Sequence, residues 1–342
     1  MYNKRTYHGR IVKFCLHSVY IILIFVLALA SCKSTGPAQD DSGKKPGSPQ
    51  AVEKAKLTKY PDAILWQIDG TAKDGTPSKV YILGTYHAGD DRVLAFPESV
   101  SNALEESDHF VCELSSQVWA QLPDMMQSLT MKSFLTDLSH TLIDDLTEEE
   151  ITLITQFIDP QTLAQLVCFE PWVLNNYLQP IVMLAADLDS QKAYDVMIMD
   201  YIATQKNNQG FEGLDDAQTQ LDLISWGDWD TQMVMLRDTL DDLKNLDIAA
   251  QEMTELYELF IQADDQAFAD FYFKDFESEI KKHPIYEEYF DSLLSKRNED
   301  WAVKIADYLE EPGVTFIFAG CAHFVGSESV FAYMNQNGTL EY

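Results

Sequence analysis

Short apolar runs bounded by turn-forming residues predict the strands of a buried β-sheet. β-branched and aromatic residues dominate these runs, as they do in strands. Asp69-Gly70 and Asp74-Gly75 separate the first two runs and predict a hairpin. The two shortest runs predict a strand inserted between helical blocks and an edge strand at the C-terminus. The six runs cover residues 63–68, 79–85, 110–114, 211–214, 315–319 and 340–342.

Longer segments between these runs have the three-to-four-residue spacing of amphipathic helices. Thr147 with Glu150 predicts a capping box, and Asp159-Pro160 predicts an N-cap followed by proline at the first helical position. Most of this helical sequence lies between the third predicted strand (residues 110–114) and the strand predicted at residues 315–319. This order indicates a helical insertion into the sheet. The predicted fold class is α/β, with a central mixed β-sheet and a large helical insertion.

Two of the predicted strands end in the same sequence, Gly-x-x-His. The first unit contains Gly84 and His87, and the second contains Gly320 and His323. Glycine allows a sharp turn or a close approach at a strand end, and the carboxyl edge of an open α/β sheet is where ligands bind. One such unit is as typical of a core or turn histidine as of a functional one. Two units predict a shared site, since histidine is a common metal ligand and general base.

A carboxylate that could join the two histidines is Glu113, which ends the third predicted strand. A charged residue there would be costly if it were buried without a partner, although a glutamate in solvent remains the alternative. Two histidines and one carboxylate meet the minimum for a divalent ion that also binds water. His140 and His283 lie in polar contexts typical of solvated side chains, and His109 is expected at a strand boundary.

Several motifs in this order resemble those of the TraB/GumN family, which includes the Tiki metalloproteases. The resemblance covers about residue 65 to the C-terminus. Asp215 replaces the family's usual Glu, and Phe324 replaces a Leu. The matching segments are Tyr81 to His87 with Phe96-Pro97, Val111 to Leu114, Pro171-Trp172, Gly213 to Gln220, Arg297-Asn298 with Trp301, and Gly320 to Gly326.

The resemblance implies that His87, Glu113 and His323 bind one metal ion. Mn²⁺ and Co²⁺ are the metals of Tiki proteins, and Zn²⁺ and Fe²⁺ also suit such ligands. The implied activity is a hydrolase, specifically a peptidase with a metal-activated water, acting on a peptide or protein substrate. Arg297 would stabilise the oxyanion or pair with Glu113, and the alternative is an ordinary surface ion pair. The chain contains no His-Glu-x-x-His sequence, which excludes the common zincin arrangement.

Two other functions stay open. The fold also resembles, more distantly, that of haem-binding lipoproteins, so the chain would then be a non-catalytic haem- or metal-binding surface lipoprotein. The third hypothesis is a regulatory scaffold with a degenerate site. Absorbance spectroscopy and metal analysis distinguish the hydrolase from the haem-binding lipoprotein, because haem has a Soret band.

Two of the cysteines lie beside the predicted site residues. Cys112 precedes Glu113, and Cys321 follows Gly320. The pair forms a disulfide if their strands are neighbours, or remains as buried free thiols, since Cys packs as a small hydrophobe. A third hypothesis makes Cys321 a thiol nucleophile beside His323.

The first 58 residues predict a lipoprotein leader and a tether. A basic start is followed by an apolar run, residues 19–30, that is too short for a stable membrane span. The run leads to Cys32 in a sequence resembling a bacterial lipobox, and the alternative is an ordinary signal peptide or a helical anchor. We therefore expect a signal peptide over 1–32, a lipidated Cys32, a disordered tether over 33–58 and the family-like domain over 59–342. This predicts a lipid-anchored protein of the bacterial cell envelope, on its periplasmic or surface face.

The net charge argues against nucleic acid as a partner. The chain has 55 acidic and 24 basic residues, which gives a formal charge of −31 at pH 7. Phosphate binding needs a basic surface, and the sequence contains no basic cluster beyond isolated pairs. The acidity is typical of a soluble protein surface.

Overall fold

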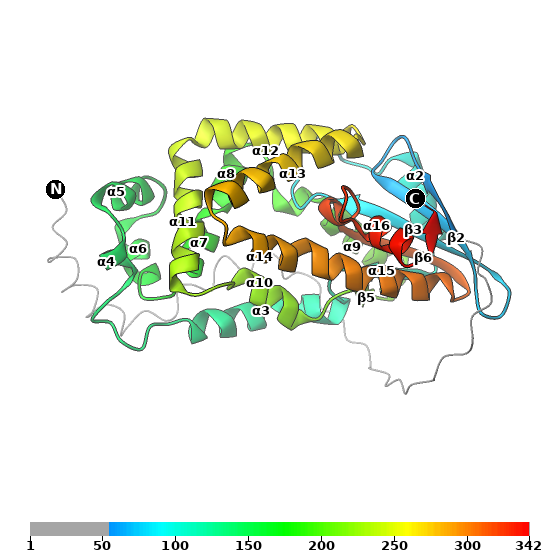
Figure 1. The fold of residues 1–342 in the computed structure, drawn as a ribbon, viewed down its shortest axis with the longest axis horizontal. Helices are drawn as coiled ribbons and strands as arrows, with labels where there is room; N and C mark the ends of the chain where they lie inside the picture. Colours follow the sequence, from blue (N-terminus) through cyan, green and yellow to red (C-terminus); the bar gives the residue numbers. More distant parts are fainter. Residues whose placement is uncertain (1–54, 342) are drawn as a thin grey trace. The chain divides into compact units, whose positions relative to one another are not determined.

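The computed structural model describes residues 55–341 of the chain (Figure 1). The predicted signal peptide, Cys32 and the tether up to residue 54 lie outside the described residues. Residues 55–58, which the sequence placed in the tether, belong to a strand, β1 (Ala55–Lys59), that pairs with two others. In the described part of the chain, no helix has the length and apolar character needed to cross a membrane.

The described residues form two compact units. The first, here called the sheet unit, contains residues 55–120, 190–216 and 256–341, and the second, the helical unit, contains residues 121–189 and 217–255. Because the helical unit is made of two separate segments, the sheet unit is interrupted twice along the chain.

The sheet unit contains the β-sheet that the apolar runs predict. Its strand order is β5-β4-β6-β3-β2-β1-β7. The strands are β1, β2 (Leu65–Thr71), β3 (Pro77–Thr85), β4 (His109–Cys112), β5 (Glu212–Gly213), β6 (Gly313–Gly320) and β7 (Leu340–Glu341).

Both parallel and antiparallel pairs occur, so the sheet is mixed, as predicted. β1, β2 and β3 are antiparallel neighbours, which confirms the hairpin. β3, β6, β4 and β5 are parallel to one another, and β7 adds to β1 as a parallel edge strand. Residues 80–85 of β3 are all buried, which is typical of a strand covered on both faces.

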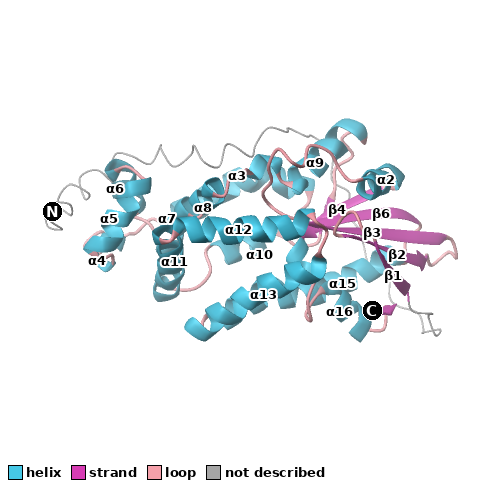
Figure 2. Ribbon diagram, turned by 90° about the horizontal axis from the view of Figure 1, so that it is seen from above, coloured by secondary structure: helices cyan, strands magenta, loops and turns pink. Residues whose placement is uncertain are grey.

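Helices cover the two faces of this sheet. α2 (Glu98–Glu106) packs on β6, and α15 (Lys296–Leu309) packs on β2 and β3. α15 lies with α16 (Val330–Gln336) in front of the sheet in Figure 1, while α2 lies behind it. Figure 2 shows the same strands and helices from above. The other helices of this unit are η3 (Ser190–Lys192), α9 (Tyr194–Gln205), α13 (Asp265–Lys282), α14 (Tyr286–Phe290), the π-helical turn η4 (Asp291–Ser295) and η5 (Cys321–His323).

The helical unit has its own hydrophobic core. Residues of α11, including Leu236 and Leu240, pack against α5, α7 and α8 in one buried cluster. The predicted capping box is present: Glu150 N–H donates to Thr147 Oγ1 over 3.1 Å, and Thr147 N–H donates to Glu150 Oε2 over 2.6 Å. The helices are α4 (Leu142–Asp145), α5 (Glu148–Phe157), α6 (Pro160–Leu166), α7 (Pro171–Leu178), α8 (Pro180–Ala185), α10 (Ala217–Ile224) and α11 (Trp229–Lys244), while α3 (Ser116–Lys132) and α12 (Leu246–Ile261) contribute to both units.

Candidate functional site

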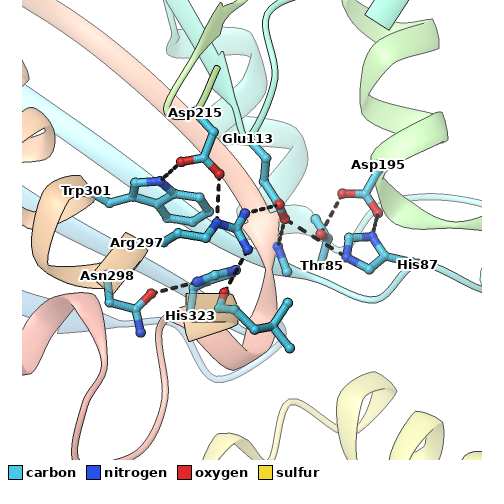
Figure 3. A network of polar contacts seen from close by, with 11 residues as sticks. Thr85, His87, Glu113, Asp195, Asp215, Arg297, Asn298, Trp301 and His323 are labelled. Atoms are coloured by element: carbon cyan, nitrogen blue, oxygen red, sulfur yellow. Dashed lines mark hydrogen bonds and ion pairs between the residues drawn. The ribbon is translucent and has the colours of Figure 1, made fainter. Parts of the chain in front are cut away.

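Three parallel strands of the sheet unit end together and bring the predicted site residues to one edge (Figure 3). In the pairing of β3 with β6, Thr85 stands opposite Gly320, and β4 pairs with the other side of β6. His87 follows β3, Glu113 follows β4, and His323 lies in the turn η5 that follows β6. The two Gly-x-x-His units are thus neighbours in space.

Gly320 lies at the centre of this arrangement. A Cβ atom on Gly320 would stand 3.2 Å from His87 Nε2, 3.4 Å from Glu113 Oε1 and 3.7 Å from His323 Cδ2. The three predicted ligands therefore border one small space, which is open because this residue has no side chain. Gly84 has a different role, since a Cβ there would meet Cys321 Cα at 3.1 Å, and glycine allows the two strands to approach.

Glu113 is held as an anion in a mostly buried position. Its Oε2 accepts a hydrogen bond of 2.6 Å from Arg297 Nη2, and its Oε1 accepts the N–H of Gly320 at 2.9 Å. The same Oε1 lies 4.0 Å from His87 Nε2. Burial alone would raise the pKa of Glu113. The positive charge of Arg297 opposes it, with help from the histidines and the Gly320 N–H, and lowers the pKa to about 2.

Arg297 is a buried ion-pair partner; the alternative of a surface ion pair is wrong. Only 6% of its side chain is exposed. Besides Glu113, Nε donates to Asp215 Oδ2 over 2.7 Å, and Nη1 donates to the carbonyl of Leu293 over 2.8 Å. Asp215 also accepts the indole N–H of Trp301 at 2.7 Å, and the guanidinium lies 4.8 Å from the centre of the Trp301 ring. One cation thus neutralises two buried carboxylates.

His323 is buried and neutral. Its Nδ1 lies 2.6 Å from Asn298 Oδ1, while Asn298 Nδ2 donates to the carbonyl of Glu328. Because this orientation turns the amide oxygen toward the ring, Nδ1 carries the proton and Nε2 keeps a lone pair. Burial, together with the charge of Arg297, lowers the pKa of His323 to about 3.

His87 differs from the other site residues because 68% of its side chain is exposed. Its Nδ1 lies 2.9 Å from Asp195 Oδ2, and Asp195 Oδ1 accepts the hydroxyl of Thr85 at 2.6 Å. The charge of Asp195 raises the pKa of His87 to about 9. The sequence analysis did not identify Asp195. It lies in the first turn of α9 without a motif around it, and only its place at a helix start distinguishes it.

The two cysteines beside the site are buried free thiols and do not form a disulfide. Burial raises the pKa of both Cys112 and Cys321 well above the ordinary value. Because the thiolate is the reactive form, this argues against Cys321 as a nucleophile.

The chemistry of these donors suits a divalent metal ion, although the three side chains are too far apart to coordinate one ion as they stand. Two imidazole Nε2 atoms and one carboxylate oxygen are the ligand types that such ions prefer. Within residues 55–341, however, no group of three or more His, Cys, Asp or Glu side chains is placed so that it could hold a metal ion. Metal binding at this edge would therefore require the three side chains to draw closer together.

A cleft of about 610 Å³ lies in the helical unit, away from these residues in the chain. Its polar groups already bond one another: Asp145 Oδ2 accepts the indole N–H of Trp229 at 3.0 Å and contacts His140 Nε2 at 2.9 Å. His140 is 61% exposed, as expected for a solvated side chain. We do not place the functional site here, since the His140 and Asp145 side chains in its wall already contact each other.

Comparison with known proteins gives one family and one relative. The model of the TraB/PrgY/gumN family matches residues 64–340. A protein of Treponema pallidum (strain Nichols), described as uncharacterized, is 23% identical over 291 residues, which are 83% of this chain and 84% of that protein. No solved structure gives a significant match. These similarities assign no activity to this chain, because the relative is itself described as uncharacterized.

Proposed function

The chain belongs to the TraB/PrgY/gumN family, and we propose that it is a metal-dependent hydrolase, a peptidase, held at a membrane of the cell envelope by a lipid on Cys32. The observation that carries the proposal is the position of His87, Glu113 and His323 around the open side of Gly320. The choice of peptide bonds as substrate rests on the resemblance of the two Gly-x-x-His units and their neighbours to Tiki proteases.

His87, Glu113 and His323 would hold the ion. Both histidines have Nδ1 next to an oxygen acceptor, which leaves Nε2 as the ligand atom. A divalent ion supplies Lewis acidity and lowers the pKa of a water molecule.

The remaining groups prepare the site for this chemistry. Arg297 keeps Glu113 ionised by lowering its pKa to about 2. The planar guanidinium has five N–H donors, more than its three observed contacts use, so a donor remains for a developing oxyanion. His87 is the exposed member of the site, and we therefore expect the substrate to approach over its ring.

The test is metal titration of the purified protein with Mn²⁺, Co²⁺ and Zn²⁺. His87→Ala, Glu113→Gln and His323→Ala are each expected to weaken binding by more than the roughly 10- to 100-fold typical of losing a supporting group. His140→Ala is the matched control, because it removes an exposed histidine of the helical unit. If the three site variants bind metal as the wild type does, the metal site is elsewhere or absent.

A peptide-library cleavage assay on the metal-loaded protein tests the hydrolase itself, with His87→Ala as the inactive reference. Metal binding without cleavage of any peptide would favour the metal-carrier hypothesis. A Soret band in tag-free protein would favour haem binding, and neither metal nor haem would favour the scaffold.

A further inference from the structure

We propose that Asp195 is a positioning residue that fixes the ring of His87 with Nε2 turned toward Glu113 and Gly320. The proposal deepens the function given above and rests on it for the role of the metal. It assigns a second carboxylate to the site, one that supports a ligand and does not itself bind the ion.

Asp195 is held from two sides by residues of the same strand end. Thr85 is the last residue of β3 and His87 follows it by two positions, and both side chains reach Asp195. The Thr85 hydroxyl donates to Oδ1 over 2.6 Å, and His87 Nδ1 contacts Oδ2 at 2.9 Å (Figure 3). Each carboxylate oxygen therefore has its own partner, and rotation of the carboxylate would break both contacts.

The surroundings favour a carboxylate at this place. Only 11% of the Asp195 side chain is exposed, and Thr85 is 1% exposed. Asp195 lies in the first turn of α9, where the backbone N–H groups and the helix dipole stabilise a negative charge. The acceptor for His87 is thus fixed before any ligand arrives.

His87 depends on this support more than His323 does. The His323 ring is 4% exposed and packs 4.2 Å from the centre of the Trp301 ring, so the core itself restrains it. The His87 ring is 68% exposed and has little packing to prevent its rotation. In a neutral ring, a proton held on Nδ1 by Asp195 leaves the lone pair on Nε2, 4.0 Å from Glu113 Oε1.

The first test is metal affinity, with Co²⁺ and Zn²⁺ as probes. Asp195→Ala is expected to weaken binding by about 10- to 100-fold, as is typical when a metal ligand loses its orienting partner. Asp195→Asn keeps an acceptor oxygen and should lose less. Asp200→Ala is the matched control, because it removes an exposed acid from the same helix.

A double variant tests whether Asp195 affects metal affinity through His87. If Asp195 acts through His87, the variant His87→Ala with Asp195→Ala should bind metal no more weakly than His87→Ala alone. A general structural role would instead add its loss to that of His87→Ala. Thr85→Val, which removes only the hydroxyl, supplies a milder variant if Asp195→Ala folds poorly.

The second test needs no metal. Nitrogen NMR at pH 10, where the ring is neutral, should show His87 protonated on Nδ1 in the wild type and a mixture of tautomers in Asp195→Ala. An unchanged tautomer and unchanged metal affinity in Asp195→Ala, together with loss of binding in His87→Ala, would overturn this inference and leave the proposed function intact. Unchanged affinity in His87→Ala would overturn the proposed function, while the tautomer would still decide the role of Asp195.

Discussion

The space beside Gly320 exists because this residue has no side chain, and not because the backbone needs glycine there. Its φ and ψ angles, −50° and 129°, are open to any L-amino acid. A methyl group would nevertheless stand 3.2 Å from His87 Nε2 and 3.4 Å from Glu113 Oε1. A side chain introduced at position 320 would therefore fill the space between the predicted ligands without removing any of them.

We predict that Gly320→Ala folds normally and binds metal at least about tenfold more weakly, a loss comparable to that of a supporting group. His87 is exposed and can swing aside, whereas Arg297 and the Gly320 N–H hold Glu113 in place. Circular dichroism checks the fold, and metal titration checks the affinity. Wild-type affinity in this variant would show that the ion does not occupy the space beside Gly320.

The ion pair of His87 and Asp195 predicts a pH dependence of the metal-free protein. Folding raises the pKa of His87 from 6.5 to about 9. The stabilisation is therefore fully present below pH 6.5 and is lost as the pH rises through about 9. Because the ring is mostly exposed, solvent screens the pair, and we expect about 1 kcal/mol or less.

Urea unfolding of the wild type and of His87→Gln between pH 6 and pH 10 measures this contribution. The difference in the free energy of unfolding between them should shrink over the alkaline half of the range. A difference that grows with pH would contradict the assigned partner. Glu113 and His323 titrate far below this window and should not interfere.

One helix, α15, supplies three groups to the site from its first two turns. Arg297, Asn298 and Trp301 lie on its buried face. Arg297 and Trp301 both donate to Asp215, and Asn298 donates to the carbonyl of Glu328. The π-helical turn η4 precedes α15, and its Leu293 carbonyl accepts from Arg297. Such turns are frequent at functional sites.

Arg297→Ala should therefore destabilise the protein by about 3–5 kcal/mol, because it leaves the buried carboxylates of Glu113 and Asp215 without their cation. Its neighbour Lys296 pairs with Asp291 on the surface, and Lys296→Ala should cost no more than about 1 kcal/mol. Chemical denaturation of both variants makes the comparison. Equal stabilities would mean that the buried charges are compensated in another way.

The sequence predicts the strands of this site better than the contacts made across it. β3, β4 and β6 are clear because their apolar runs are continuous and end at glycine or a charged residue. Asn298, Trp301 and Asp215 are found through the family resemblance alone. Asp195 is found by neither route, because an acid in the first turn of a helix usually serves the helix dipole, and only the three-dimensional fold brings it to His87.

The chain as a whole combines a sheet unit with a helical unit inserted in two pieces. The site residues His87, Glu113, Asp195, Asp215, Arg297 and His323 all belong to the sheet unit. The helical unit keeps a separate core around Leu236 and Leu240. Substitutions in that core should therefore lower the free energy of unfolding more than they weaken metal binding.

The lipid anchor is a prediction for the segment before this body. Cells fed a clickable palmitate should label the wild-type protein and not Cys32→Ser, since the thiol of Cys32 would carry the lipid. Immunoblotting should find the labelled form with the membranes. Equal labelling of both proteins would contradict lipidation at this position.

The strand order also determines when the sheet can form during synthesis of the chain. β6 lies between β3 and β4, and Ile82 pairs with Ile317, near the other end of the chain. The two halves of the sheet therefore remain unjoined, with open strand edges, until β6 has been made. Such distant pairing slows folding and exposes the chain to aggregation. Because Gly320 and His323 arrive with β6, the protein has no assembled site until its sheet closes, and a truncated chain would carry none.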